Sequence, residues 1–318
     1  MMSIRSVGLN VCVAVGLSMS LAATNLAAAA TAATPAKKTA DNALQRLNVA
    51  EQQEMLAERL SRTWAMKGIA SLRSRSSSQF DEDSRRYVKQ LKSLQADADT
   101  PQLKENYAQL EQLWSKYLEA AEASAVQLQV RSGDSRGELG SELPPTAFVG
   151  STQGNAPRQP EKLNMPDTVK AIADQSDKLV ATAAKGSDLL RQRIGAEPSE
   201  GLRLAGQART LSQRMAKLYF FKALGVSAPS LTADMKKTQE AYLASIKRVR
   251  ELSEDRPKSS SALFLVDQQW VFFNEILQRN VEREERDQVY QTFARTSDSL
   301  LSGLDDLCKT FEQPAPAP

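Results

Sequence analysis

Histidine is absent from the 318-residue sequence, and cysteine occurs only twice. The lack of histidine removes the commonest general base and the commonest zinc ligand, and two cysteines are too few for a thiolate metal cage. No glycine-rich phosphate loop and no nucleophile with an identifiable base can be found either. The sequence therefore indicates a protein that is not an enzyme and that uses no metal or cofactor.

Aromatic residues make up only 6% of the chain, and several of the 14 glycines and 13 prolines are confined to two segments. Long stretches rich in Ala, Leu, Gln, Glu, Lys and Arg are left almost unbroken, which favours helix. The 41 basic residues nearly balance the 38 acidic ones, for a formal net charge of +3. Because nucleic-acid binding needs a clustered basic surface, we expect an all-α fold without a nucleic-acid partner.

Residues 1–33 have the pattern of a secretory signal peptide. Arg5 is followed by an uncharged apolar run over 7–21 and by alanine-rich sequence with several A-x-A cleavage sites. An uncleaved anchor is the alternative, because the apolar run nearly reaches spanning length. Ala and Thr, rather than Lys or Arg, follow the run and favour cleavage. We therefore expect a periplasmic protein with peripheral or no membrane contact, in which Cys308 is either buried and inert or a free thiol, with burial favoured.

The spacing of apolar residues predicts helices along most of the remaining chain. A serine-rich stretch at 74–79 is expected to break the first of them, which Asp41 or Asn42 can cap. Residues 131–165 are rich in Gly, Ser, Pro, Asn and Gln and predict a disordered loop, as does the proline-rich tail at 313–318. The expected helices are 41–75, 81–98, 100–130, 169–194, 199–225, 231–254, 260–280 and 282–311.

The sequence contains an internal repeat in which residues 48–62 align with 203–217. A single tryptophan follows in the third helix of each copy, Trp114 and Trp270, and we expect both to be core anchors. The fourth helices share a phrase, Q-S-D-K-L-V from residue 175 and T-S-D-S-L-L from residue 296. The repeat predicts two tandem up-down four-helix units, 41–194 (interrupted by the 131–165 loop) and 199–312.

Residues 204–217 read L-A-G-Q-A-R-T-L-S-Q-R-M-A-K. This phrase resembles the first helix of the extracytoplasmic sensor domain in PilJ-type pilus chemoreceptors and nitrate/nitrite sensor kinases, where the pattern is close to A-G-x-x-R-M-L-S-Q-R-M-A-K. The resemblance covers both repeats and is weaker in the first. It implies an up-down four-helix bundle that dimerises along its first helices. In the nitrate sensors it also implies that one arginine from each subunit grips an anion at the interface.

Carried over by position, the anion-binding arginine is Arg209, and Glu54 stands at the same place in the first repeat. The family's glycine is Gly206, whose counterpart is Glu51. From the residues themselves, an arginine offers a planar fork of donors suited to an oxyanion, and a glycine lets another backbone approach closely. An ordinary salt-bridge role for Arg209 is the alternative reading.

Three further residues belong to the predicted ligand-binding set. Gln213 lies on the same strip of the helix as the ligand arginine, four residues further on. The downstream arginine of the motif is kept in both repeats, as Arg59 and Arg214.

Even numbers of up-down helices return the chain to its starting end, so one chain can imitate the family's homodimer as an intramolecular pseudo-dimer. That arrangement predicts Glu54 near Arg209 and a direct ion pair between them. The resemblance implies a ligand-sensing or small-anion-binding accessory protein, with nitrate or nitrite as ligand. A membrane sensor, chemoreceptor or transport protein is the implied partner. The alternative is a helical interaction or scaffold protein that kept the fold and lost the ligand.

Overall fold

The computed structural model describes residues 20–133, 165–226 and 229–313. Every regular element in these ranges is helical, which confirms the predicted all-α fold class. The chain divides into two compact units, Met1–Ala43 and Leu44–Pro318. Both repeats fall within the second unit.

Several of the described helices begin at a proline or are followed by a glycine. Pro101, Pro229 and Pro257 are each the first residue of a helix, where a missing N–H costs nothing. Gly195 and Gly225 follow helices with φ values of 97° and 89°, which glycine adopts without strain. In chain order the elements are α1 (Ser20–Lys67), η1 (Ala70–Leu72), α2 (Arg73–Ala96), α3 (Pro101–Gly133), α4 (Met165–Ile194), α5 (Ala196–Ala223), α6 (Pro229–Ser253), α7 (Pro257–Gln278), η3 (Arg283–Glu285) and α8 (Arg286–Phe311).

The serine-rich stretch at 74–79 does not break the helix, contrary to the prediction. It lies inside α2, and the chain turns earlier, between Gly68 and Leu72. The serines are compatible with helix because their hydroxyls bond to carbonyls one turn back. Ser76 Oγ donates to Leu72 O at 2.9 Å, and Ser78 Oγ donates to Ser74 O at 3.4 Å. The break instead follows from Gly68, which weakens helix most strongly after proline.

The predicted cap at Asp41 is also wrong, because α1 already begins at Ser20. Residues 1–19 of the predicted signal peptide, nearly all of the 131–165 loop and the tail from 314 lie outside the described residues, so these assignments stay predictions. Within the described ranges, none of the helices combines the length and the hydropathy needed to cross a bilayer.

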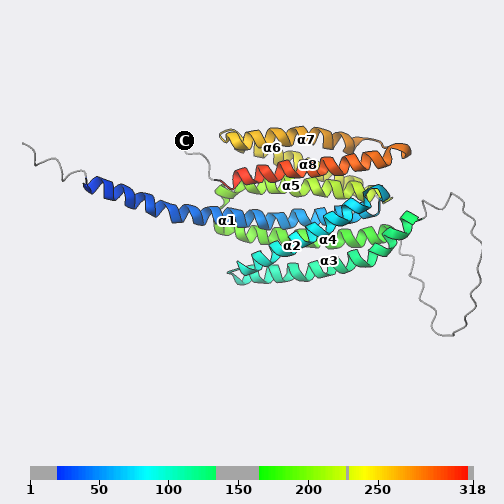
Figure 1. The fold of residues 1–318 in the computed structure, drawn as a ribbon, viewed down its shortest axis with the longest axis horizontal. Helices are drawn as coiled ribbons and strands as arrows, with labels where there is room; N and C mark the ends of the chain where they lie inside the picture. Colours follow the sequence, from blue (N-terminus) through cyan, green and yellow to red (C-terminus); the bar gives the residue numbers. More distant parts are fainter. Residues whose placement is uncertain (1–19, 134–164, 227–228, 314–318) are drawn as a thin grey trace, which may run out of the picture. The chain divides into compact units, whose positions relative to one another are not determined.

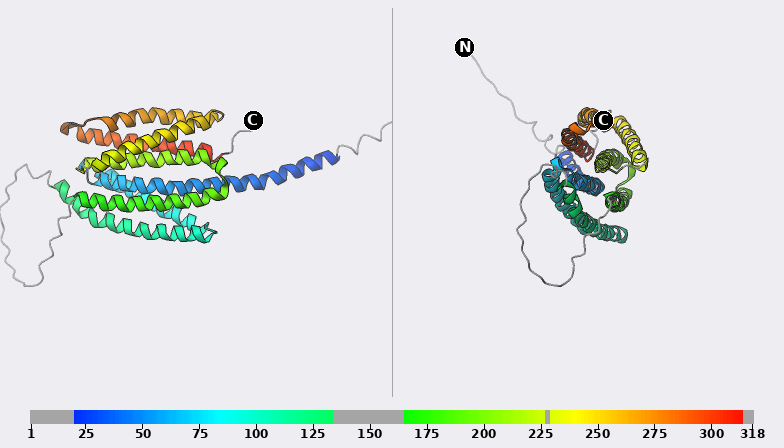
Figure 2. Two further views of the ribbon diagram at one scale, coloured as in Figure 1. Left: turned by 180° about the vertical axis from the view of Figure 1, so that it is seen from behind. Right: turned by 90° about the vertical axis from the view of Figure 1, so that its right-hand side faces the viewer.

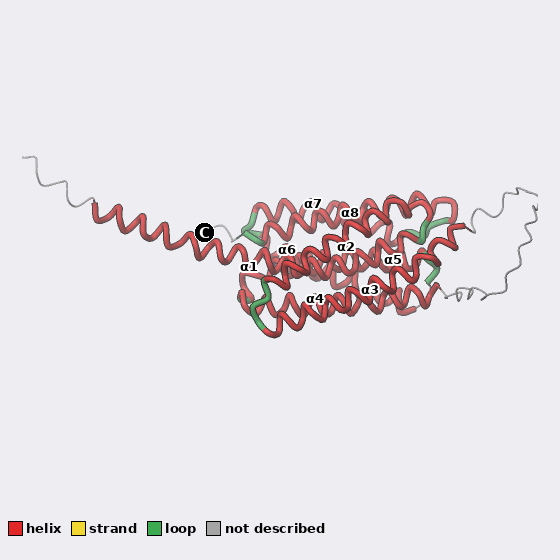
Figure 3. The backbone as a smooth tube through the Cα atoms, turned by 60° about the horizontal axis from the view of Figure 1, so that its bottom comes forward, coloured by secondary structure: helices red, strands yellow, loops and turns green. Residues whose placement is uncertain are grey.

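Within the second unit, α1, α4, α5 and α8 form a central group of helices. Side-chain hydrogen bonds connect α1 to α4, α5 and α8, and connect α5 to α4 and α8. The α2–α3 pair of the first repeat lies on one side of this central group, and the α6–α7 pair of the second repeat lies on the opposite side (Figures 1 and 2). Turning the molecule shows the helices of the second unit running lengthwise alongside one another (Figure 3). The first helix of each repeat is therefore at the centre.

Equivalent aromatic stacks hold the two helices of each outer pair together. In the first stack the ring of Trp114 lies 4.4 Å from the ring of Tyr87 in α2 and 5.8 Å from the ring of Tyr117 in α3. In the second stack the ring of Trp270 lies 4.3 Å from the ring of Tyr242 in α6 and 5.8 Å from the ring of Phe273 in α7. Trp114 is buried and Trp270 is partly buried against the core, so both are core anchors as predicted. The stacks consist of Tyr87, Trp114 and Tyr117 in the first repeat, and Tyr242, Trp270 and Phe273 in the second.

We expect Trp114→Leu to lower the free energy of unfolding by about 3 kcal/mol, because it leaves a cavity between α2 and α3 and removes ring stacking. Trp270→Leu should cost about half as much, since Trp270 retains more solvent contact. Urea denaturation followed by circular dichroism measures both. A larger loss for Trp270→Leu would contradict the burial difference between the two stacks.

Candidate functional site

The first helices of the two repeats, α1 and α5, lie side by side and run in the same direction. Asn48 contacts Arg209 near one end, and Glu58 contacts Arg214 further along. Close to the first of these contacts, Gly206 of the family-like phrase faces Glu51, which occupies the equivalent position in the first repeat. A Cβ atom added at Gly206 would lie 2.3 Å from Glu51 Oε2, so no larger residue fits there without moving that carboxylate.

Arg209 of α5 is fully buried where α1 and α5 meet, and its counter-ion is Asp305 of α8, the fourth helix of the same repeat. Its Nη1 donates to Asn48 Oδ1 and to Asp305 Oδ1, each at 2.9 Å. The Nε and Nη2 groups of the same guanidinium have no hydrogen-bond partner. A buried donor without a partner costs free energy, so this arginine keeps unused binding capacity.

The predicted ion pair between Glu54 and Arg209 does not form. Glu54 Oε1 instead accepts a hydrogen bond from Ser187 Oγ of α4 at 2.8 Å. The physical reason is that each residue turns towards the fourth helix of its own repeat, Glu54 towards α4 and Arg209 towards Asp305 of α8. Sequence alignment placed the two residues at equivalent positions but could not fix their side-chain directions.

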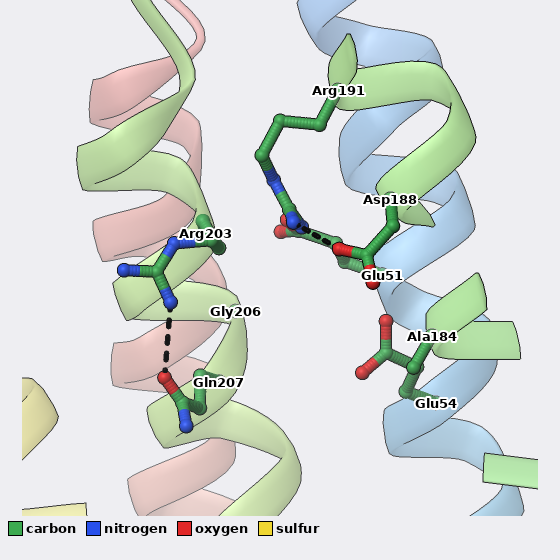
Figure 4. Close-up of a pocket in the computed structure, with 8 residues that line it drawn as sticks. All are labelled: Glu51, Glu54, Ala184, Asp188, Arg191, Arg203, Gly206 and Gln207. Carbon is green, nitrogen blue, oxygen red and sulfur yellow. Dashed lines mark hydrogen bonds and ion pairs between the residues drawn. The ribbon is translucent and has the colours of Figure 1, made fainter. Parts of the chain in front are cut away.

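A cleft of about 180 Å³ opens where α1, α4 and α5 meet. Figure 4 shows the residues of α5 on one side, and those of α1 and α4 on the other. The charged lining is mainly acidic, with three carboxylates against two guanidinium groups. The lining residues are Glu51, Glu54, Ala184, Asp188, Arg191, Arg203, Gly206 and Gln207.

One of the two arginines in the cleft is already ion-paired. Arg191 donates through Nη2 to Glu51 Oε1 at 3.1 Å and through Nη1 to Asp188. Across the cleft, Arg203 makes only a long hydrogen bond of 3.4 Å to Gln207. Glu51 is nearly fully buried, and its Oε2 atom has no hydrogen-bond partner. The cleft therefore holds unused carboxylate acceptors, one arginine that is occupied (Arg191) and one that is largely free (Arg203).

The two glutamates of α1 are harder to ionise than ordinary carboxyl groups. Burial raises the pKa of Glu54 to about 7, and the neighbouring Glu51 carboxylate adds to the effect. Burial also raises the pKa of Glu51, against the opposing influence of Arg209 and Arg191. Two carboxyl groups that share a small partly dry space favour the protonated form of at least one of them. Glu54 is thus a titratable group near neutral pH.

Further along α1 and α5, two ion-pair clusters connect the repeats. In each, the aspartate of one repeat's fourth helix meets two basic residues of the other repeat's first helix. Asp298 Oδ1 lies 3.2 Å from Arg59 Nη1 and 2.8 Å from Arg62 Nη2. Asp177 Oδ1 lies 2.9 Å from Arg214 Nη1 and 3.3 Å from Lys217 Nζ. We call them the Asp298 cluster (Asp298, Arg59 and Arg62) and the Asp177 cluster (Asp177, Arg214 and Lys217).

The serine before each aspartate also accepts a hydrogen bond from a basic residue of the other repeat's first helix. Arg62 Nη1 donates to Ser297 Oγ at 2.8 Å, and Lys217 Nζ donates to Ser176 Oγ at 3.4 Å. Burial alone would raise the pKa of Asp298, but the guanidinium groups of Arg62 and Arg59 outweigh it and hold that pKa below its usual range. The shared Ser-Asp phrase of the fourth helices therefore has a structural role that the sequence alone did not reveal.

The structure thus separates the predicted site residues. Glu54 and Gly206 line the cleft, whereas Arg209 is buried behind it. Arg59 and Arg214 lie in the ion-pair clusters, away from the cleft lining. Gln213 is fully buried and donates through Nε2 to Ser297 Oγ at 3.5 Å.

Sequence reasoning missed three charged residues of the cleft, Arg203 of α5 and Asp188 and Arg191 of α4. Arg203 directly precedes the family-like phrase and matches no position of it. The two α4 residues belong to no motif, and the insertion before α4 obscured how α4 aligns with α8 beyond the shared phrase. Within the described ranges, no group of three or more acidic or cysteine side chains could hold a metal ion. Comparisons with protein-family models, with curated proteins and with solved structures found no match.

The clusters yield a contrast between their two aspartates. Asp298→Asn leaves the fully buried Arg62 without a carboxylate, and we expect it to lower the free energy of unfolding by about 2–4 kcal/mol. Asp177→Asn should cost under about 1 kcal/mol, because Asp177 is half exposed and Glu58 still neutralises Arg214 and Lys217. Urea titrations of both variants decide the point, and equal losses would contradict the assigned difference in burial.

Glu54 gives a second, pH-dependent contrast. Its folded-state pKa of about 7 exceeds the ordinary value of 4.5, so its contribution to stability is present below pH 4.5 and is lost as the pH rises through 7. Glu54→Gln abolishes this titration. We expect the wild type to lose about 2 kcal/mol more than the variant between pH 5.5 and 8. Parallel pH slopes for the two proteins, measured by urea denaturation, would refute the raised pKa.

Proposed function

We propose that the two repeats form an intramolecular pseudo-dimer built along α1 and α5. Three sets of equivalent contacts support this proposal. The first helices meet in parallel at the equivalent pair Glu51 and Gly206. In the Asp298 cluster the first helix of the first repeat pairs with the fourth helix of the second repeat, and in the Asp177 cluster the first helix of the second repeat pairs with the fourth helix of the first. The aromatic stacks of the outer helices match in both spacing and order.

We further propose that the protein is an exported, non-enzymatic accessory protein that binds a small polar ligand in the cleft between α1, α4 and α5. The observation that carries this proposal is the unpartnered Oε2 atom of Glu51, which is buried at the cleft. Buried polar atoms in folded proteins are nearly always hydrogen-bonded, and exceptions call for an explanation such as a ligand. A ligand donor facing this atom would supply that hydrogen bond.

The charge of the cleft favours a ligand with a cationic group, such as an amine or an amino acid, over a bare anion. The Glu54 carboxyl lines the cleft and is placed to accept from an ammonium group. Glu51 Oε2 would join it once the Glu51 side chain moves away from Gly206. Arg203 lies across the cleft with only a long contact to Gln207, and it is placed to hold an anionic or carbonyl end. A ligand that carried only negative charge would face three carboxylates.

A small oxyanion such as nitrate or nitrite is the second candidate. It is favoured by the two N–H groups of Arg209 that have no partner. Its site would lie behind Glu51, and entry would require that side chain to move away from Gly206. The two ligand classes therefore depend on different residues.

Thermal unfolding and titration calorimetry of the whole chain, with small amines, amino acids, nitrate and nitrite at pH 6 and pH 8, test the proposal. An amine needs ionised Glu54, whose pKa is about 7, so we expect affinity to rise up to roughly tenfold from pH 6 to pH 8. Glu54→Gln should weaken binding and remove the pH dependence. Glu105→Gln, at an exposed position of α3, serves as the control.

Two other results of these titrations would contradict the amine proposal. Nitrate or nitrite binding that Arg209→Lys abolishes, without amine binding, would replace the first candidate with the second. A stable protein that binds no member of the panel at either pH would contradict both ligand proposals and leave the helical scaffold reading.

A further inference from the structure

The second repeat carries an exposed apolar surface that the first repeat lacks. On α7 the side chains of Phe264, Leu265, Val271 and Phe272 are 61%, 56%, 62% and 57% exposed. Leu243 of α6 is 46% exposed, and its chain neighbour Tyr242 stacks on Trp270 of α7. We call the five residues Leu243, Phe264, Leu265, Val271 and Phe272 the α7 apolar surface.

The internal repeat shows that the fold does not require this surface. Trp114 and Trp270 occupy equivalent places, which aligns the outer face of α3 with that of α7. The positions equivalent to the four α7 residues are also exposed in the first repeat. There they are occupied by small or polar residues, namely Ala108, Gln109, Ser115 and Lys116. Large apolar side chains on one of two equivalent helix faces therefore need an explanation other than folding.

The size of the surface is appropriate to a protein contact. Five side chains of this kind, each about half exposed, present roughly 500 Å² of apolar area, near the upper end for a soluble monomer. A standard interface buries about 800 Å² on each partner. The polar rim around the apolar residues supplies the remainder.

The apolar residues of α7 are arranged symmetrically about Gln268. Phe264 and Phe272 lie four residues before and after it, and Leu265 and Val271 lie three before and after it. Residues three and four apart share one face of a helix. If two copies of α7 cross antiparallel about Gln268, Phe264 therefore meets Phe272 of the second copy, and Leu265 meets Val271. Each of the four apolar residues of α7 is then covered by another.

The charges agree with the same pairing. One turn beyond the apolar residues, Glu275 would face the uncharged Ser261 of the second copy, and Lys258 would face Gln278. Asp267, at the edge of the surface, is already neutralised by Arg250 of α6 at 2.9 Å. Along α7 no like charges are brought together, and a twofold contact of this kind is self-complementary by construction.

We propose that two copies of this chain dimerise through the α7 apolar surface, with the two α7 helices antiparallel about Gln268. The contact lies on the outer α6–α7 pair, on a different part of the second unit from the cleft between α1, α4 and α5 (Figure 1). Dimerisation therefore leaves that cleft open in each chain.

Sedimentation velocity of the whole chain over a range of micromolar concentrations tests the proposal. The test variant receives the residues of the first repeat: Phe264→Ala, Leu265→Gln, Val271→Ser and Phe272→Lys. We expect the wild type to sediment with twice the mass of one chain, and the variant with a twofold lower mass and a thermal midpoint within a few degrees of the wild type. These exposed side chains contribute little to the core, so the variant should stay folded.

A cysteine cross-link tests the register independently of stability. Gln268→Cys places the new thiols of two chains across the proposed axis, and mild oxidation should give a disulfide-linked dimer on a non-reducing gel. Gln112→Cys, the exposed equivalent on α3, should stay uncross-linked. A monomeric wild type at every concentration, a variant that remains dimeric, or equal cross-linking of the two cysteine variants would each overturn the proposal.

Discussion

The ion pairs between each repeat's first helix and the other repeat's fourth helix are the interaction on which the rest of the second unit depends. Arg62 is fully buried, and such a charge is tolerated only beside a counter-ion and hydrogen-bond acceptors. Asp298 and Ser297 supply both, and they come from the far end of the chain. The Asp177 cluster makes the reciprocal connection with Lys217. Neither repeat therefore satisfies its own buried charges alone, and both fall within one compact unit.

The same arrangement explains where the cleft lies and why it is acidic. Holding α1 and α5 in parallel brings the equivalent positions of the two repeats together, so any difference between them is concentrated at one place. There the second repeat has Gly206, and the Glu51 side chain of the first repeat occupies the space beside it. Where the second repeat has Gly206 and Arg209, the first repeat has Glu51 and Glu54, so this place is rich in carboxylates. A raised pKa for Glu54 follows from that crowding and from burial.

The helical fold class and the position of most helix ends were predictable, because they depend on local composition, proline and glycine. The serine-rich stretch misled because serine is helix-compatible when its hydroxyl bonds to the preceding turn, as in Ser76. The partners of Arg209 were not predictable, since alignment relates positions and says nothing of side-chain direction. The Ser-Asp phrase was visible as a repeat, yet its pairing with the opposite first helix depends on contacts more than two hundred residues apart in the case of Asp298.

Differential scanning calorimetry of the whole chain tests the interlocked arrangement most directly. If the two repeats complete each other's buried ion pairs, they must unfold together. We then expect one transition, with a calorimetric enthalpy equal to the van't Hoff enthalpy. Two separate transitions, or a calorimetric enthalpy close to twice the van't Hoff value, would show that the repeats unfold independently and would contradict this coupling.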